Sequence, residues 1–288
     1  MLPPWLRKKS AHHSQIHPLK KLVRGHHLHT VCEESRCPNL GECWALKKQT
    51  VMILGDRCTR RCHFCSITTA KPLPPDPQEP TKVAQLIKTL GLRYVVVTSV
   101  TRDDLPDEGA SHWAATVRAI HELNPGIKIE LLIPDMEEKR ECVRIIMETQ
   151  PHVMAHNIET VERLTPEIRG RATYRRSLRV MGMFKEIQAS MITKSGLMVG
   201  HGESFDEVLQ TMRDLRAVAC DSLTVGQYLQ PTKAQRPVIH YVEPKIFEKI
   251  QEVGYDLGFK QVAAGPFVRS SYHADQMWIH EAQERDSI

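Results

Sequence analysis

The sequence VMILGDRCTRRCHFC at residues 51–65 joins a short apolar run to three closely spaced cysteines. The run VMIL has the length and composition of a strand that is buried on both faces. Comparable runs recur along the chain at 94–97, 127–133, 152–159, 192–200 and 222–229. Helical patterns separate these runs, which predicts parallel strands joined by right-handed crossovers.

Six strands with intervening helices predict the fold class. A closed eight-unit barrel ordinarily needs about 250 residues, whereas about 210 lie between positions 50 and 260. We therefore predict an α/β protein built as a partial (β/α)6 TIM-like barrel with N-terminal and C-terminal extensions. The expected segments are an N-terminal arm at 1–49, the barrel at 50–235, and a C-terminal helix and closing segment at 236–288. In such barrels the chemistry lies at the C-terminal ends of the strands, where these cysteines follow the first strand.

Local signals predict several helix ends. Asp135 with Glu138 and Ser204 with Glu207 have the spacing of capping boxes, and each pair precedes an apolar stripe. The sequence NPG at 124–126 ends the helix before it.

The composition is that of an ordinary globular chain of 288 residues, with 41% hydrophobic and 25% charged content. No apolar run approaches the ~20 residues needed to cross a bilayer, so the sequence predicts no membrane-spanning segment. The 39 basic and 34 acidic residues give a net charge of +5. This mild excess favours an acidic protein partner over nucleic acid.

The first 32 residues contain six Lys or Arg residues and no Asp or Glu. A transit peptide is one interpretation of such a segment. This stretch is poor in Arg and Ser, however, and it runs almost directly into Cys32. We therefore interpret it as a basic extended arm of the mature protein.

Six of the eight cysteines form two groups, a first triplet and a second triplet. The first triplet is Cys32, Cys37 and Cys43, and the second triplet is Cys58, Cys62 and Cys65. Clustered thiols in a long chain are typical of a reducing compartment rather than of a disulfide-rich secreted protein, which predicts a cytoplasmic location. Cys142 and Cys220 lie in apolar helical patterns and are expected in the core.

The second triplet has the spacing C-x3-C-x2-C. Three thiolates this close suit three irons of a [4Fe–4S] cubane and leave the fourth iron without a protein ligand. Structural zinc needs four closed ligands, for which His63 is the only local candidate, and a disulfide leaves an odd thiol. The spacing therefore favours an iron–sulfur cluster.

The first triplet, with the spacing C-x4-C-x5-C, is less diagnostic. Three thiols suit a zinc site, an electron-relay cluster, or a cluster with chemistry of its own, and spacing does not choose among these. An electron carrier would usually close both clusters with four cysteines and would have no need of a barrel-sized scaffold.

Phe64 stands directly before the last cysteine of the second triplet, which resembles the signature of the radical S-adenosylmethionine (SAM) superfamily and makes Phe64 a candidate SAM contact. Longer stretches resemble one family within it, the lipoyl synthases. They include HTVCEESRCPNLGECW (29–44), LGDRCTRRCHFCSI (54–67), IRGRATYRRSL (168–178), TVGQYLQPT (224–232) and GPFVRSSYHAD (265–275). The resemblance runs from about Trp5 to Asp275. One departure is His201, where an apolar residue is expected.

The resemblance implies two [4Fe–4S] clusters and SAM as cofactors. The second triplet would hold the cluster whose open iron binds SAM, and an electron from this cluster cleaves SAM to a 5′-deoxyadenosyl radical. The first triplet would hold an auxiliary cluster, whose fourth ligand is a serine of the RSSY motif. By position this serine is Ser271, with Ser270 as the alternative. A serine oxygen is a hard ligand and should leave iron more easily than a thiolate.

The resemblance also implies the reaction and its partners. Two SAM molecules are consumed to remove hydrogen from C6 and C8 of an octanoyl chain on a lysine of an acidic carrier domain. The auxiliary cluster donates the two sulfur atoms. The carriers are lipoyl domains of 2-oxoacid dehydrogenases and the glycine-cleavage carrier protein, with flavodoxin or ferredoxin as the expected electron donor. Alternatives are another radical SAM sulfur-inserting enzyme and a two-cluster electron-transfer protein.

Polar residues on the strands are further candidates for SAM contacts. Thr98 and Ser99 end the second strand and would meet the SAM amine. Asn157 and Glu159 end the fourth strand, where they either bind SAM or cap the following helix. Lys194 lies on the fifth strand, where a buried cation needs an anion such as the SAM carboxylate or a neighbouring acid.

Five arginines form a basic group on one short segment, namely Arg169, Arg171, Arg175, Arg176 and Arg179. One interpretation is a solvated helix face. The other is a docking patch for the acidic carrier, which would speed encounter between the two proteins.

Overall fold

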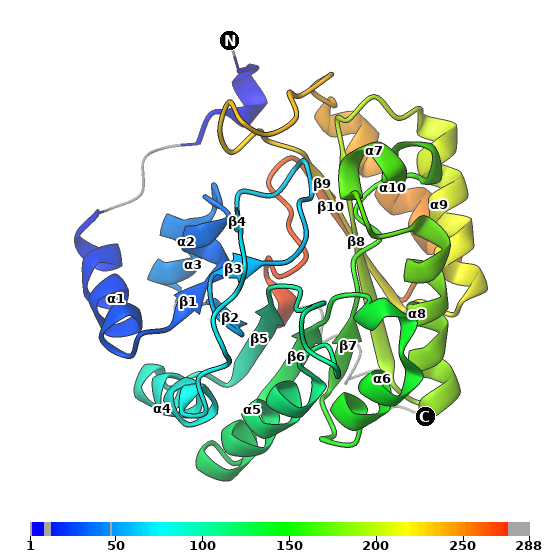
Figure 1. Ribbon diagram of the computed structural model, residues 1–288. Helices are drawn as coiled ribbons and strands as arrows, with labels where there is room; N and C mark the ends of the chain where they lie inside the picture. Colours follow the sequence, from blue (N-terminus) through cyan, green and yellow to red (C-terminus); the bar gives the residue numbers. More distant parts are fainter. Residues whose placement is uncertain (1, 9–12, 47, 276–288) are drawn as a thin grey trace.

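The computed structural model describes residues 2–8, 13–46 and 48–275 (Figure 1). Its centre is one eight-stranded sheet with the order β1-β2-β5-β6-β7-β8-β9-β10. The strands are β1 His29–Thr30, β2 Thr50–Ile53, β5 Tyr94–Ser99, β6 Lys128–Leu132, β7 Val153–Ala155, β8 Ile192–Val199, β9 Ser222–Gln227 and β10 Gln261–Gly265. Strand β1 is antiparallel to β2, and the other neighbouring pairs of this sheet are parallel.

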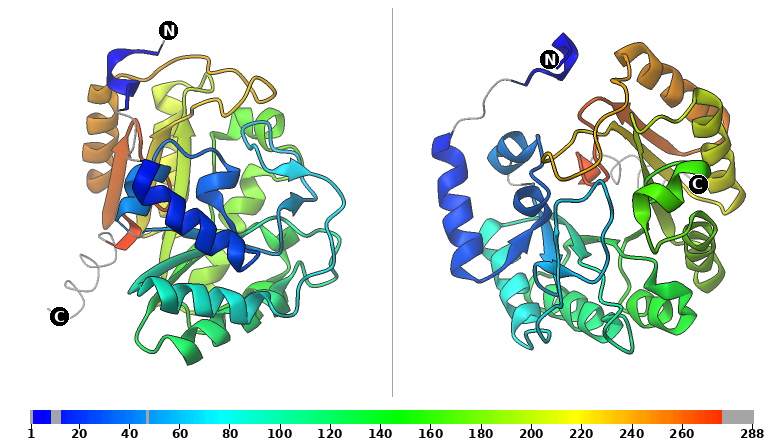
Figure 2. Two further views of the ribbon diagram at one scale, coloured as in Figure 1. Left: turned by 90° about the vertical axis from the view of Figure 1, so that its left-hand side faces the viewer. Right: turned by 45° about the horizontal axis from the view of Figure 1, so that its top comes forward.

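Helices form a ring around the outside of the curved sheet (Figure 1, Figure 2). They are α4 Glu79–Leu90, α5 Ala110–Leu123, α6 Arg140–Met147, α7 Thr165–Arg169, α8 Tyr174–Ile187, α9 Phe205–Ala217 and α10 Pro244–Asp256. Strands β1 and β10 are the two edges of the sheet and do not pair with each other. The prediction of an α/β partial TIM-like barrel is confirmed. Along the described part of the chain, no helix combines the length and apolar character that a membrane crossing requires.

All six predicted strands are present as consecutive neighbours in the sheet, and β1 and β10 extend it. Strand β10 was not predicted because its sequence, QVAAG, contains one large apolar residue and resembles a loop. A second small sheet pairs β3 Arg57–Cys58 with β4 Thr68–Thr69 in parallel. This pair closes the loop that carries the second triplet.

The prediction of an extended N-terminal arm is wrong over α1 His13–Gly25, which is helical. Ile16 and Val23, seven residues apart on one face of α1, are both buried. Ile16 packs with Cys32 and Trp44 in a small second core. Helix α1 therefore lies beside α2 Val31–Glu34 and α3 Leu40–Ala45, outside the ring of barrel helices (Figure 2).

The local helix signals have mixed outcomes. Ser204 and Glu207 form the predicted capping box at the start of α9. Asp135 accepts a hydrogen bond from the backbone N–H of Glu137 and caps the short 3-10 helix Met136–Glu138. Glu138 instead pairs with Arg179, so the capping box predicted for Asp135 and Glu138 is wrong. The remaining 3-10 helices are Pro4–Leu6 and Glu162–Leu164.

The core prediction for the two isolated cysteines is confirmed. Cys142 on α6 and Cys220 before β9 are both buried in the main hydrophobic core. Helix α5 ends at Leu123, as the following Asn-Pro-Gly sequence predicted.

Candidate active site

The second triplet lies on the loop after β2, at the C-terminal ends of the strands. Within that loop Arg60 is buried and forms ion pairs with Asp103 at 2.6 Å and with Asp135 at 2.8 Å. These acids follow β5 and β6, so the network ties the cysteine loop to two further strands. Burial alone would raise the pKa of Asp135, but the hydrogen bond and charge of Arg60 outweigh it and lower the pKa to about 2.

We expect Arg60→Gln to destabilise this loop, because it leaves Asp135 buried beside a neutral amide. Loss of one partner of a buried pair costs about 3–5 kcal/mol. The pKa of Asp135 is depressed in the folded chain, so its stabilising effect is present above its ordinary pKa of 3.8 and is lost as pH falls toward about 2. Urea unfolding at pH 7 and pH 3 should show a smaller pH dependence in the variant.

The control for this prediction is Arg118→Gln, because Arg118 is exposed on α5. It should leave the free energy of unfolding nearly unchanged at both pH values. An Arg60→Gln variant as stable at pH 7 as the Arg118→Gln control would contradict the anchoring role of Arg60.

A cavity of about 540 Å³, called here the central cavity, opens above the strand ends. Its walls bring together predicted site residues from distant parts of the chain. They are Cys32, Cys37, Cys58, Cys62, Phe64, Cys65, Thr98, Ser99, Asn157, Glu159, Ser270 and Ser271. The complete second triplet and two cysteines of the first triplet therefore face one space.

A second cavity, of about 530 Å³ and called here the auxiliary cavity, adjoins the first. It is lined by the complete first triplet and by Ser271. Cys32, Cys37 and Ser271 line both cavities, whereas Ser270 lines the central cavity and not the auxiliary cavity. The two cavities therefore meet at the first triplet.

The segment 265–275, which carries the two serines, lies inside the ring of helices (Figure 2). Contacts to its backbone hold it there. The Asn39 side chain donates a hydrogen bond to the carbonyl of Phe267 at 2.7 Å. A Cβ atom at Gly226 would lie 2.0 Å from the carbonyl oxygen of Val268. The segment therefore crosses β9 so closely that no side chain fits at position 226.

Burial raises the pKa of several thiols in the two triplets. The pKa is about 12 for Cys43 and Cys62 and about 11 for Cys65, and that of Cys32 is also raised. These thiols are neutral at pH 7, so metal binding has to displace their protons. In the described ranges no three His, Cys, Asp or Glu side chains surround a single metal ion. A cubane spreads three thiolates over three irons, and the donor set of each triplet fits such a cluster.

The wall of the central cavity contains polar atoms without a partner. Among the described residues, Ser99 Oγ and Asn157 Oδ1 are buried and have no hydrogen bond. Burial also raises the pKa of Glu159, whose backbone has a φ of +66°. Unpaired buried polar atoms cost free energy, and a bound ligand with amine and hydroxyl groups would satisfy them. The residues present thus fit SAM.

Lys194 lies outside this arrangement and corrects one prediction. Its buried ammonium donates to both carboxylate oxygens of Glu130, at 2.9 and 3.1 Å. The Tyr94 hydroxyl donates to the same carboxylate at 2.6 Å. Lys194 is not among the residues that line the central cavity. Its anion is therefore the neighbouring acid and not SAM.

The five arginines do not form one exposed basic patch. Arg169 is buried, and its guanidinium donates to Ser177 Oγ at 2.7 Å. The others pair with acids, Arg171 with Glu137, Arg175 with Glu162, Arg176 with Asp135 and Arg179 with Glu138. This arrangement favours the solvated helix face over the docking patch.

Sequence analysis missed several residues of the central cavity, among them Arg60 and Arg269. Each lies within a predicted ligand motif, Arg60 between Cys58 and Cys62 and Arg269 as the first residue of RSSY, which was a usable signal. His201, the departure from the family pattern, is buried, and its ring stacks on Tyr228 with 4.1 Å between ring centres. Burial lowers the pKa of His201 to about 4. Tyr228 lines the central cavity, whereas His201 does not. His201 therefore packs against a residue of the cavity wall.

Comparison with known proteins gives consistent results. The family model of the Radical SAM superfamily matches residues 52–215. The lipoyl synthase of Thermus thermophilus is 50% identical over 98% of this chain and 88% of its own length. That of Aquifex aeolicus is 48% identical over 93% of this chain and 98% of its own. That of Shouchella clausii is 50% identical over 98% of this chain and 91% of its own.

Two solved structures share the fold at low sequence identity. Methylornithine synthase (PylB) has a TM-score of 0.57 at 15% identity and covers 90% of this chain and 87% of its own. SuiB from Streptococcus suis has a TM-score of 0.60 at 14% identity, over 78% of this chain and 52% of its own. These relatives, together with cysteines of both triplets around one cavity, show that the chain belongs to the lipoyl synthase family, radical SAM enzymes that use two [4Fe–4S] clusters to insert two sulfur atoms into a protein-bound octanoyl group.

Proposed function

We propose that hydrogen abstraction takes place in the central cavity, with the second triplet holding the cluster that binds SAM. When bound, this cluster and SAM supply the 5′-deoxyadenosyl radical that removes hydrogen from the octanoyl chain. One observation carries the proposal, which is that this single cavity is lined by the complete second triplet and by Cys32 and Cys37 of the first triplet. An octanoyl carbon activated at one triplet is then enclosed together with the sulfur source at the other.

SAM is held in this proposal by the polar wall of the cavity. The Glu159 carboxylate and Asn157 Oδ1 accept hydrogen bonds from the SAM amine or ribose hydroxyls, and Ser99 adds a hydroxyl. The hydroxyl of Thr98 already donates to a backbone carbonyl, which leaves its lone pairs for the ligand. Phe64 contributes an apolar contact.

The fourth ligand of the auxiliary cluster is assigned to Ser271 rather than Ser270. Ser271 lines the auxiliary cavity together with all three cysteines of the first triplet. Ser270 faces the central cavity, where the Asn157 amide donates to its hydroxyl at 3.4 Å. Tyr272, next in the chain, donates from its hydroxyl to Glu42 on α3 at 2.6 Å, which supports this orientation of the segment.

The octanoyl arm of the lipoyl carrier domain, the substrate of this family, enters the central cavity. Apolar side chains line part of its wall, including Met52, Val100 and Leu132. They suit a saturated hydrocarbon, which gains about 25 cal/mol for each Å² removed from water. The carrier protein itself stays outside, because a cavity of this volume admits an arm and not a domain.

Three finer assignments complete the proposal. The segment 1–49 supplies the auxiliary cysteines, 50–235 the barrel and its SAM site, and 236–288 the closing serine. A flavodoxin or ferredoxin supplies the electrons, because the second triplet needs a one-electron donor of low potential. The enzyme works in the cytoplasm, where clustered thiols stay reduced.

The proposed function is tested with reconstituted protein, SAM, a strong reductant and an octanoylated lipoyl domain. The mass of the domain should change by exchange of two hydrogens for two sulfurs, with two 5′-deoxyadenosines formed for each lipoyl group. A lipoyl domain carrying acetyl in place of octanoyl is the control and should gain no sulfur. Formation of 5′-deoxyadenosine without any gain of sulfur would overturn the assignment.

A further inference from the structure

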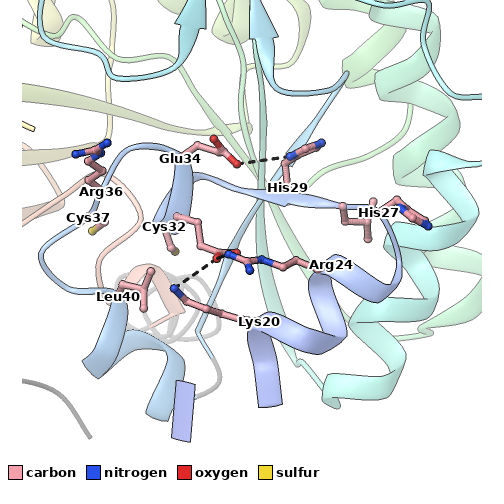
Figure 3. Close-up of a pocket in the computed structure, with 11 residues that line it drawn as sticks. Lys20, Arg24, His27, His29, Cys32, Glu34, Arg36, Cys37 and Leu40 are labelled. Atoms are coloured by element: carbon pink, nitrogen blue, oxygen red, sulfur yellow. Dashed lines mark hydrogen bonds and ion pairs between the residues drawn. The ribbon is translucent and has the colours of Figure 1, made fainter. Parts of the chain in front are cut away.

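A third cavity, of about 770 Å³ and called here the outer cavity, lies between α1 and the first triplet (Figure 3). Lys20 and Arg24 of α1 form one wall, and the segment from Cys32 to Leu40 forms the other. Figure 3 shows the side chains of Cys32 and Cys37 on the second of these walls. The outer cavity therefore reaches the first triplet from the solvent side.

This route is separate from the central cavity. No residue of the second triplet and neither serine of the RSSY motif lines the outer cavity, whereas Cys32 and Cys37 line all three cavities. In the family's reaction the central cavity has to hold SAM and the octanoyl arm at the same time. An approach through the outer cavity would leave both in place.

Ion pairs hold α1 across the mouth of the outer cavity (Figure 3). Glu33 accepts from Arg24 at 3.1 Å and lies 3.6 Å from Lys20. The Arg24 side chain is 70% exposed, whereas that of Glu33 is 15% exposed. Exposed pairs of this kind contribute little to stability. These ion pairs can therefore break and re-form, so they do not permanently block the entry of small ions into the outer cavity.

The chemistry of the walls suits small inorganic ions. The wall carries three cations, Lys20, Arg24 and Arg36, together with the acids Glu33 and Glu34, so it offers charged groups of both signs to hydrosulfide and to iron. His27 and His29 carry imidazole groups, which bind iron transiently. A lipoyl synthase consumes sulfur from its auxiliary cluster, so iron and sulfide must return to the first triplet before another turnover.

We propose that the outer cavity is the passage through which iron and sulfide reach the first triplet when the auxiliary cluster is rebuilt. The proposal rests on the assignment of that triplet to the auxiliary cluster. Two ferrous ions, two ferric ions and four hydrosulfide ions make one [4Fe–4S]²⁺ cluster and release four protons to solvent, with no net electron transfer. The cysteine thiols and the serine hydroxyl each release one proton to solvent when they bind iron.

The test is Lys20→Trp, which fills the outer cavity from a helical position. The matched control is Lys21→Trp, because Lys21 is the exposed next residue on α1, carries the same charge and does not line the cavity. Both are made in the full chain with Cys58, Cys62 and Cys65 replaced by Ala. Equal ferrous and ferric iron with sodium sulfide is added to the cluster-free protein without oxygen, and absorbance and bound iron are followed.

We expect Lys20→Trp to load its cluster several-fold more slowly than the Lys21→Trp control. In the otherwise unmodified enzyme, preloaded with both clusters, Lys20→Trp should form as much lipoyl product in its first turnover as the parent. Equal loading rates for the two tryptophan variants would overturn the passage.

Two further outcomes keep the assignments separate. If the parent chain without the second triplet takes up no cluster at all, the assignment of the first triplet to the auxiliary cluster is wrong. The proposed passage then fails with it. If Lys20→Trp loses first-turnover product as strongly as it loses loading rate, the tryptophan disturbs the site itself, and the passage is again overturned. Thermal unfolding midpoints of both tryptophan variants show that each chain is folded.

Discussion

A Cys58→Ala variant is expected to form 5′-deoxyadenosine at no more than background rate. On the proposed assignment, the change removes one of the three thiolates that hold the SAM-binding cluster, and the loop at 54–67 has no cysteine besides those of the second triplet. Without this cluster, no electron reaches SAM. The measurement is chromatographic quantification of 5′-deoxyadenosine after incubation with SAM and a strong reductant.

A Cys37→Ala variant should behave in the opposite way and provides the internal comparison. The second triplet is intact, so SAM cleavage should continue at a rate close to that of the parent. The auxiliary cluster loses a ligand, so sulfur transfer to the octanoyl domain should stop. If both variants lost SAM cleavage to the same degree, the division of work between the triplets would be wrong.

A Ser271→Cys variant is expected to cleave SAM but to insert little or no sulfur. A thiolate is a softer ligand than a serine oxygen and binds iron more tightly, so a fourth cysteine should hold together a cluster that has to be dismantled. The measurement compares 5′-deoxyadenosine with lipoyl product in one incubation. Their ratio, which is two in the parent reaction, should rise steeply.

The matched control for this prediction is Ser270→Cys. Ser270 lines the central cavity and does not line the auxiliary cavity. The thiolate introduced at 270 should leave the ratio of the two products near its parent value. A steep rise in the Ser270 variant, with a normal ratio in the Ser271 variant, would exchange the roles of the two serines.

The parts of the fold that could be predicted depend on local pattern. The six buried strands, the capping box of Ser204 and the thiol spacings each occupy a short stretch, so periodicity and motif identify them. Strand β10 was not predicted because its residues are small and its position is set by pairing with β9. Helix α1 was not predicted because the basic residues and Pro18 obscured its apolar stripe.

The errors at the site concern partners that are distant in the sequence. Lys194 needed an anion, and its partner Glu130 lies 64 residues away on a neighbouring part of the sheet. Asp135 had the spacing of a helix cap, but its carboxylate also neutralises Arg60. In both cases the residue type indicated a charged side chain that needs a partner. The residue that lies next to it in the folded chain decided its role.

The contact between Asn39 and Phe267 joins positions 228 residues apart. On the proposed assignment, the last ligand of the auxiliary cluster therefore leaves the ribosome later than the second triplet. The second triplet and the strands beneath it emerge earlier. During synthesis, the centre that starts the radical reaction can be assembled before the store of sulfur that would be consumed by it.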